Sequence, residues 1–119
     1  MGAPFVWFDL TVAAGDEVDG FYRDLFGWSM EPGVGDYRAW MSDGDQPWAG
    51  TVAAGNVPSG RWVPYVVVDD LDAAAKRAVD LGGSVVRDRQ DGPAGTSVVV
   101  ADPGGALLAL FTPAAPAGG

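Results

Sequence analysis

Asp9 is a carboxylate in the middle of an apolar segment, Phe5 to Val12. A charge buried there without a partner would be costly, so we expect a ligand, another side chain or solvent to stabilise it. One hypothesis is a functional role, either as the counter-ion of a cationic or hydrogen-bond-donating ligand or as a general acid or base. The alternative is a structural pair with Arg23, Arg38 or Arg61, or simple exposure to solvent.

The amino-acid composition excludes several kinds of catalytic and metal site. The chain has no histidine and no cysteine, which removes the commonest general base, the commonest metal ligand and every thiolate site. Its serines have no histidine to activate them. With 7 Lys and Arg against 16 Asp and Glu, the net charge of −9 also disfavours nucleic acid and anionic membrane surfaces as partners.

Aromatic residues offer the second kind of chemistry, which is ligand binding. Tyr37, Trp40 and Trp48 fall in short segments of the first half that could form the rim of a pocket. Arg38 lies among them and could orient an anionic group, although a solvated surface arginine is the simpler interpretation. Five tryptophans in 119 residues can equally serve as core, and Trp28 and Trp62 are predicted to do so.

The elements that must position these residues follow from hydrophobic periodicity. The first half reads as a strand over Phe5 to Val12, with Trp7, Asp9 and Thr11 on one face. A helix follows, capped by Asp16 and ended by Gly27, with an apolar stripe of Val18, Phe21, Tyr22, Leu25 and Phe26. Three strands then read at Trp28 to Glu31, Tyr37 to Ser42 and Ala49 to Ala54.

The second half repeats this plan. A strand at Trp62 to Val68 precedes a helix capped by Asp70 or Asp72, whose apolar face is Leu71, Ala74, Ala75, Ala78 and Leu81. Strands follow at Ser84 to Arg87, Thr96 to Ala101 and Ala106 to Phe111. An offset of 56 residues superimposes Asp16 on Asp72, Leu25 on Leu81 and Gly27 on Gly83. The sequence therefore predicts two βαβββ modules, residues 1–56 and 57–113, and a disordered tail over 114–119.

Three motifs resemble the vicinal oxygen chelate superfamily, which includes glyoxalase I, bleomycin-resistance proteins and extradiol dioxygenases. They are Phe21-Tyr22 followed by Gly27, the stretch Val68 to Asp72 leading into a helix that ends Leu81-Gly82-Gly83, and the turn Asp102-Pro103-Gly104-Gly105. The resemblance covers roughly residues 5 to 113. It implies an α+β fold of two tandem βαβββ modules that form a curved, cup-shaped mixed sheet with the helices outside.

The resemblance also implies where a metal would be held. Metal-dependent members place one ligand on the first strand and one on the last strand of each module. The family motifs and the internal repeat both put these positions at Trp7, Ala53, Val63 and Ala109. None of these side chains is a metal ligand, so we expect a metal-free member with no cofactor.

The cup that the resemblance implies would be lined by apolar and aromatic residues, which suits an apolar or aromatic ligand. The predicted ligand-binding residues are Trp7, Asp9, Tyr37, Arg38, Trp40, Trp48, Thr51, Tyr65, Leu107 and Phe111. We expect a binding protein of the bleomycin-resistance type, for instance one that sequesters an antibiotic. The alternatives are a metal-independent isomerase, lyase or hydroxylase-associated protein using Asp9 as its acid or base, and an interaction module whose cup is filled by its own side chains.

The remaining expectations concern the oligomeric state and the cellular location. Small members of this superfamily are usually homodimers, so the resemblance implies a homodimer here, with each cup formed within one chain or between two swapped chains. The sequence shows no apolar run long enough to span a bilayer and no secretion signal, which favours a cytoplasmic protein.

Overall fold

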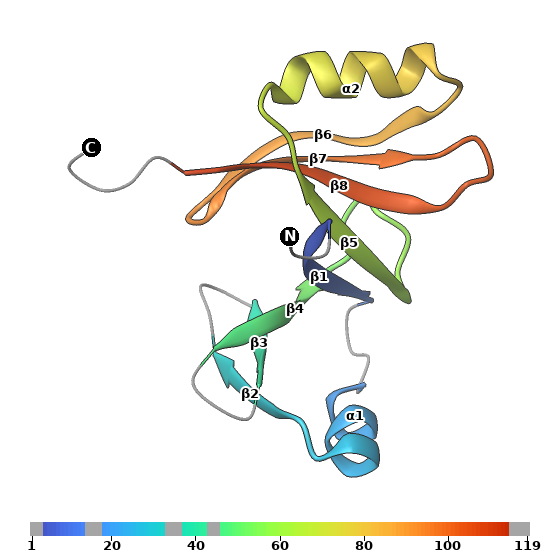
Figure 1. Ribbon diagram of the computed structural model, residues 1–119. Helices are drawn as coiled ribbons and strands as arrows, with labels where there is room; N and C mark the ends of the chain where they lie inside the picture. Colours follow the sequence, from blue (N-terminus) through green and yellow to red (C-terminus); the bar gives the residue numbers. More distant parts are fainter. Residues whose placement is uncertain (1–3, 14–17, 33–36, 43–45, 115–119) are drawn as a thin grey trace. The chain divides into compact units, whose positions relative to one another are not determined.

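The computed structural model describes residues 4–13, 18–32, 37–42 and 46–114 and contains the βαβββ order twice. The chain forms two compact units, Trp7 to Val63 and Met1 to Val6 with Pro64 to Gly119. Figure 1 follows the chain through both. The α+β class and the mixed sheet are confirmed. The predicted Asp16 cap and residues 115–119 of the tail lie outside the described residues, and the closure of a cup stays a prediction.

The unit Trp7 to Val63 is built on four strands in the order β2-β3-β4-β1. Strand β1 (Phe5–Val12) pairs parallel with β4 (Pro47–Ala53), whereas β2 (Ser29–Pro32), β3 (Arg38–Met41) and β4 pair antiparallel. A parallel neighbour requires a crossover connection. Helix α1 (Asp19–Phe26) and the strands β2 and β3 supply it between β1 and β4.

A β-bulge opposite Trp40 and Met41 shapes this sheet. Trp40 pairs with Ala49, but Met41 pairs with Pro47, so Trp48 is an extra residue on β4. A bulge bends its strand and re-aims a side chain. The Trp48 ring consequently joins the rings of Trp28 and Trp62, with centroids 4.8 and 6.1 Å away.

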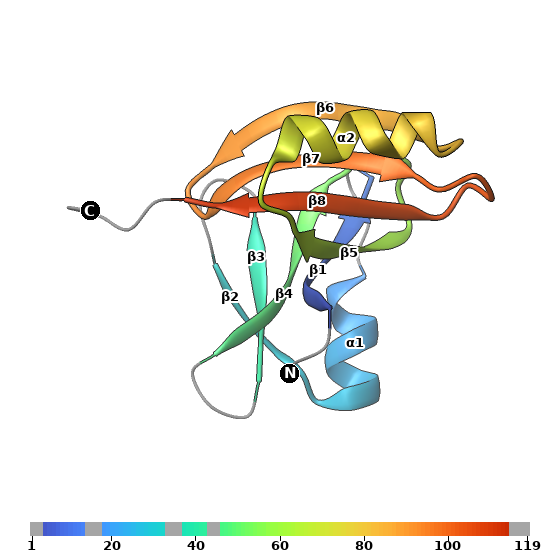
Figure 2. The same cartoon turned by 45° about the horizontal axis from the view of Figure 1, so that its top comes forward.

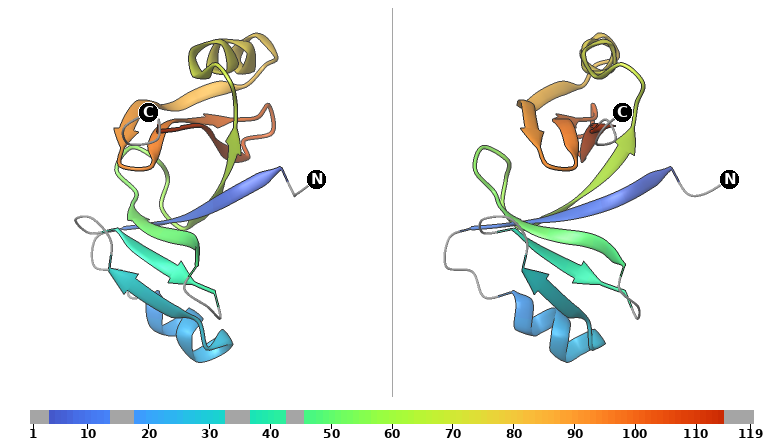
Figure 3. Two further views of the ribbon diagram at one scale, coloured as in Figure 1. Left: turned by 60° about the vertical axis from the view of Figure 1, so that its left-hand side comes forward. Right: turned by 90° about the vertical axis from the view of Figure 1, so that its left-hand side faces the viewer.

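Helix α1 packs on this sheet mainly through Tyr22. The Tyr22 ring contacts those of Trp28, Trp40 and Trp62 at centroid distances of 5.5, 5.7 and 5.5 Å. In both views of Figure 3, α1 lies next to β2. The predicted apolar stripe is wrong in extent, however, because Phe21, Leu25 and Phe26 remain exposed on the helix.

The other unit is a four-stranded sheet in the order β5-β8-β7-β6, formed with the part of β5 that starts at Pro64. Its strands are β5 (Arg61–Val67), β6 (Ser84–Gly92), β7 (Gly95–Ala101) and β8 (Leu107–Pro113), with β5 parallel to β8. Helix α2 (Leu71–Asp80) covers one face of β6, β7 and β8, as Figures 1 and 2 show.

The core beneath α2 is that predicted from periodicity. Leu71 is buried against Val98, Val100 and Leu110, and the alanines of the helix pack on the same cluster. The Asp70 side chain caps the helix by accepting a hydrogen bond from the backbone N–H of Ala73 at 3.0 Å. Leu81 was predicted on the apolar face but is exposed, because the helix ends at Asp80 and Leu81 is its C-cap.

Several strands extend beyond their predicted bounds. Strand β4 starts at Pro47, two residues before the predicted Ala49, and β6 runs to Gly92 instead of ending at Arg87. The polar end of β6 has no apolar alternation and is held by its antiparallel ladder to β7 instead. In the described part of the chain, neither helix has the length and apolar character needed to cross a membrane.

Candidate functional site

Strand β1 presents two chemically different faces in its unit. Asp9 pairs with Gly50 of β4 and Leu10 pairs with Thr51, and paired residues in a sheet share a face. The face of Leu10 is the one against which α1 and the aromatic core lie. Trp7, Asp9 and Thr11 therefore project from the opposite face, as their alternation predicted.

Three of the predicted site residues form one hydrogen-bonded network on that face. The Trp7 indole Nε1 donates to Asp9 Oδ1 at 2.8 Å and to the Tyr37 hydroxyl oxygen at 2.9 Å. The Tyr37 hydroxyl in turn donates to Asp9 Oδ1 at 2.9 Å. Asp9 is only 7% exposed, whereas both rings are half-buried. The network holds a carboxylate between two aromatic rings whose outer parts are open to solvent.

Gly50 makes room for this arrangement. A Cβ atom built on Gly50 would collide with the hydroxyl and ring carbons of Tyr37, so the tyrosine ring lies directly on the glycine backbone. Because Gly50 is also the pairing partner of Asp9, the same position brings the phenol and the carboxylate together. We refer to Trp7, Asp9, Tyr37 and Gly50 as the carboxylate site.

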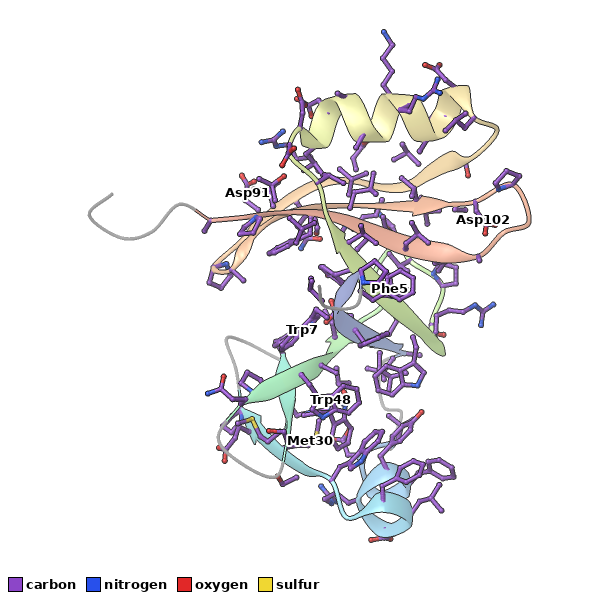
Figure 4. All side chains as sticks on the ribbon, viewed as in Figure 1. Phe5, Trp7, Met30, Trp48, Asp91 and Asp102 are labelled. Atoms are coloured by element: carbon purple, nitrogen blue, oxygen red, sulfur yellow. The ribbon has the colours of Figure 1, made fainter. Side chains whose placement is uncertain are left out.

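Several other predicted ligand residues lie on the core side. Trp40 is fully buried, with its ring 5.7 Å from that of Tyr22 and 5.8 Å from that of Trp28. Thr51 is 1% exposed and pairs with Leu10, so it does not share the face of Asp9. In Figure 4, Trp7 and Trp48 lie on opposite sides of β4. Trp40, Trp48 and Thr51 are thus placed with the aromatic core of the unit.

Arg38 has a structural partner. Its Nη2 atom lies 3.1 Å from Asp19 Oδ2 at the first residue of α1, and it also donates to Asp19 Oδ1. This ion pair links β3 to the start of α1. The guanidinium that was predicted to orient a ligand anion therefore binds Asp19 instead. The site gains Gly50 instead, a residue that the sequence pattern did not single out.

The positions that would hold a metal in this superfamily can be checked against the strand register. Asp9 pairs with Gly50, and its repeat equivalent Tyr65 pairs with Ala109. The β4 counterpart of Ala109 in the sheet is therefore Gly50, not the predicted Ala53.

The donor set fails in either alignment, since glycine, alanine and valine side chains offer no metal ligand and an indole N–H is only a donor. No group of three or more His, Cys, Asp or Glu side chains suited to a metal occurs among the described residues. A resident metal does not fit these positions.

In the other unit, the face of the sheet turned away from α2 carries the remaining predicted residues. The Tyr65 and Phe111 rings meet edge to face, with centroids 5.6 Å apart, and Leu107 lies on the same face by register with Ala101. Arg87, which no sequence motif singled out, also lies on this face, and its Nη2 donates to Ser97 Oγ at 2.5 Å. A lone arginine in a polar stretch gave no signal, because only the pairing of β6 with β7 places it there.

The paired βαβββ units define a class of protein, the vicinal oxygen chelate superfamily, which the sequence motifs indicated. The sequence model of the family described as "Glyoxalase-like domain" matches residues 6–111. The chain belongs to this family.

Two of the curated relatives come from Streptomyces. The chain is 36% identical to "Anthracycline biosynthesis protein DnrV" of Streptomyces peucetius, over 92% of this chain and 46% of that protein. It is equally similar, with the same coverage, to "Anthracycline biosynthesis protein DauV" of Streptomyces sp. strain C5. The chain thus spans about half the length of the curated relatives it matches.

Solved structures agree on the fold. A Mn(II)-bound glyoxalase from Novosphingobium aromaticivorans has a TM-score of 0.60 at 16% identity, over 92% of this chain and 38% of that one. Methylmalonyl-CoA epimerase from Mycobacterium tuberculosis has a TM-score of 0.59 at 20% identity, over 97% and 94%. At these identities the likeness shows the fold alone.

Proposed function

We propose that the chain is a small-molecule-binding module whose carboxylate site receives a planar aromatic ligand that carries an ammonium or other hydrogen-bond-donating group. The Trp7–Asp9–Tyr37 network is the observation that carries this proposal. Its two half-buried rings provide aromatic surface, and Asp9 provides an acceptor of the right charge between them. Aromatic rings also attract cations through their faces, so both parts of the site favour the same ligand class.

The curated relatives support the same ligand class. Anthracyclines are planar fused-ring compounds, and those with an amino sugar carry an ammonium group. The relatives with that word in their names are about twice as long as this chain, so their whole activity is not transferred to it. A net charge of −9 would further raise the local concentration of a cationic drug.

We also propose that binding needs no resident metal and no chemical step. Trp7, Gly50, Val63 and Ala109 offer no donors for a metal, and holding a ligand needs no catalytic group. Native mass spectrometry of the purified protein tests the first part. Stoichiometric zinc, manganese, iron or nickel that survives dialysis would contradict it.

The binding test uses daunorubicin, an anthracycline with an ammonium group, titrated into the protein with calorimetric or fluorescence detection. The variant Asp9→Asn removes the charge and keeps nearly the same shape. A hydrogen bond to a charged group contributes about 1.5–3 kcal/mol, so the variant should bind about ten- to hundredfold more weakly. Asp24→Asn, at an exposed position on α1 of the same unit, is the matched control for net charge.

The outcomes separate the possible functions. Equal weakening by Asp9→Asn and Asp24→Asn would reduce the effect to net charge and refute the carboxylate site. Conversion of the probe by the wild-type protein, lost about 10²–10⁴-fold in Asp9→Asn, would instead establish Asp9 as an acid or base. No binding of daunorubicin at millimolar concentration would reject the proposed ligand class.

A further inference from the structure

Arg87 is a half-buried arginine that the carboxylate site does not use. Its Nη2 donates to the neutral hydroxyl of Ser97, and its Nε reaches only the backbone oxygen of Asp88 at 3.5 Å. The ion pairs found among the described residues are those of Arg38 and Arg89, and Arg87 belongs to neither. Among the described residues its one side-chain partner is a serine, and a charge so placed on a partly buried face is a feature to explain.

The strand register places Arg87 at one end of a row across the sheet. Arg87 pairs with Val99, Val99 with Ala109, and Ala109 with Tyr65, so all four side chains share the face turned away from α2. In the next row, Ser97 pairs with Phe111. Neighbouring strands lie ~4.8 Å apart, so the Cα atoms of Arg87 and Tyr65 are separated by three steps, or ~14 Å.

The side chains in the middle of this row are small, whereas those at its two ends are large. Val99 and Ala109 are buried, whereas Arg87, Tyr65 and Phe111 are half-buried and offer the accessible atoms. The edge-to-face pair of Tyr65 and Phe111 forms the aromatic end, and the guanidinium forms the cationic end. A two-ring aromatic compound with one acidic group has comparable length and the same distribution of chemistry.

The backbone of β6 is irregular on both sides of Arg87. The pairing with β7 shifts between Val85 and Arg87, and again between Arg87 and Gln90. Bulges re-aim side chains and are over-represented beside functional sites. The two shifts bring the guanidinium onto the face of Ser97, in a stretch where simple alternation would not have predicted it.

We propose that this row binds a planar aromatic anion such as an aryl carboxylate. The anionic oxygens would bind the fork of N–H groups on Arg87, and the rings would lie against Tyr65 and Phe111. A guanidinium matches a carboxylate with two parallel hydrogen bonds, which are stronger than those to a neutral partner. The row shares no residue with the carboxylate site, so its test does not depend on the function proposed above.

The test compares two probes of nearly identical shape, 2-naphthoate and the neutral 2-naphthamide, by calorimetry or NMR titration. Wild-type protein should bind 2-naphthoate about tenfold or more tightly than 2-naphthamide, and Arg87→Gln should lose this preference. Arg89→Gln is the matched control, because Arg89 is on the same strand, is exposed and pairs with Asp72. Both variants change the net charge by one.

Three results would overturn the proposal: no preference for 2-naphthoate in the wild type, the same loss in both variants, or no 2-naphthoate binding at millimolar concentration. A measurement on the wild type covers the case in which Arg87→Gln fails to fold. In NMR spectra, 2-naphthoate should shift the Arg87 Nε–H and Tyr65 ring signals and leave Arg89 Nε–H unchanged. The reverse pattern would also refute the site.

Discussion

Replacing Gly50 by alanine should dismantle the carboxylate site without touching any of its polar groups. The added methyl would occupy the place of the Tyr37 hydroxyl and ring, so the tyrosine must move. It would lose its bond to Asp9 and the bond from Trp7, each 2.9 Å long. The first is worth about 1.5–3 kcal/mol and the second about 0.5–1.5 kcal/mol. Lower entropy of the unfolded chain offsets about 0.4–1 kcal/mol, which leaves a net loss of about 1–4 kcal/mol.

Urea unfolding followed by far-ultraviolet circular dichroism measures this loss, with Gly20→Ala as the control. Gly20 lies in α1, and its added Cβ would meet only Arg23 Nη2 at 3.9 Å, so alanine there should stabilise the helix by up to about 1 kcal/mol. In a Tyr37→Ala background, Gly50→Ala should cost much less, because the colliding ring is gone. A loss that persists unchanged in that background would refute the reasoning, and so would the absence of any loss in Gly50→Ala.

Two further predictions concern the aromatic core and the exposed helix. Trp40→Ala should cost about 3–5 kcal/mol of stability, because the ring is fully buried, whereas Trp7→Ala should cost less but abolish daunorubicin binding. Equal effects of both variants on binding would show that the core and the site are not separate. We also predict that two copies pair through α1, where Leu25 is 58% exposed and Phe21 and Phe26 add further exposed apolar surface. Light scattering should then give a dimer mass that Leu25→Lys lowers to a monomer mass, and a wild-type monomer at high concentration, or a dimer that survives the substitution, would contradict this interface.

The sequence predicted the second module more completely than the first. Helix α2 shows the predicted alanine face, and Leu71 enters the core where a period of 3.6 residues puts it. Its cap at Asp70 was one of two predicted possibilities. In the first module, Phe21, Leu25 and Phe26 satisfy the same period but stay exposed, because periodicity gives the direction of a side chain and not what covers it.

The candidate site was predicted only in part. Alternation along β1 correctly put Trp7 and Asp9 on one face, but Trp40, Trp48 and Thr51 were assigned to a ligand and lie with the core. The bulge in β4 explains the error for Trp48. One extra residue in β4 reverses the alternation on either side of it, and no local pattern in the sequence marks where this happens.

The amino-acid sequence by itself determined the order of elements, the duplicated βαβββ plan and the lack of metal ligands at the superfamily positions, because each of these depends on residue types and short-range periodicity. Only the tertiary structure decided that Tyr37 lies on Gly50 and donates to Asp9, and that Arg87 shares a face with Ser97, Tyr65 and Phe111. These arrangements bring together residues 10 to 28 positions apart through the strand register. Register is set by the pairing of whole strands and by their bulges, so a shift of one residue exchanges the two faces of a strand while the local sequence stays the same.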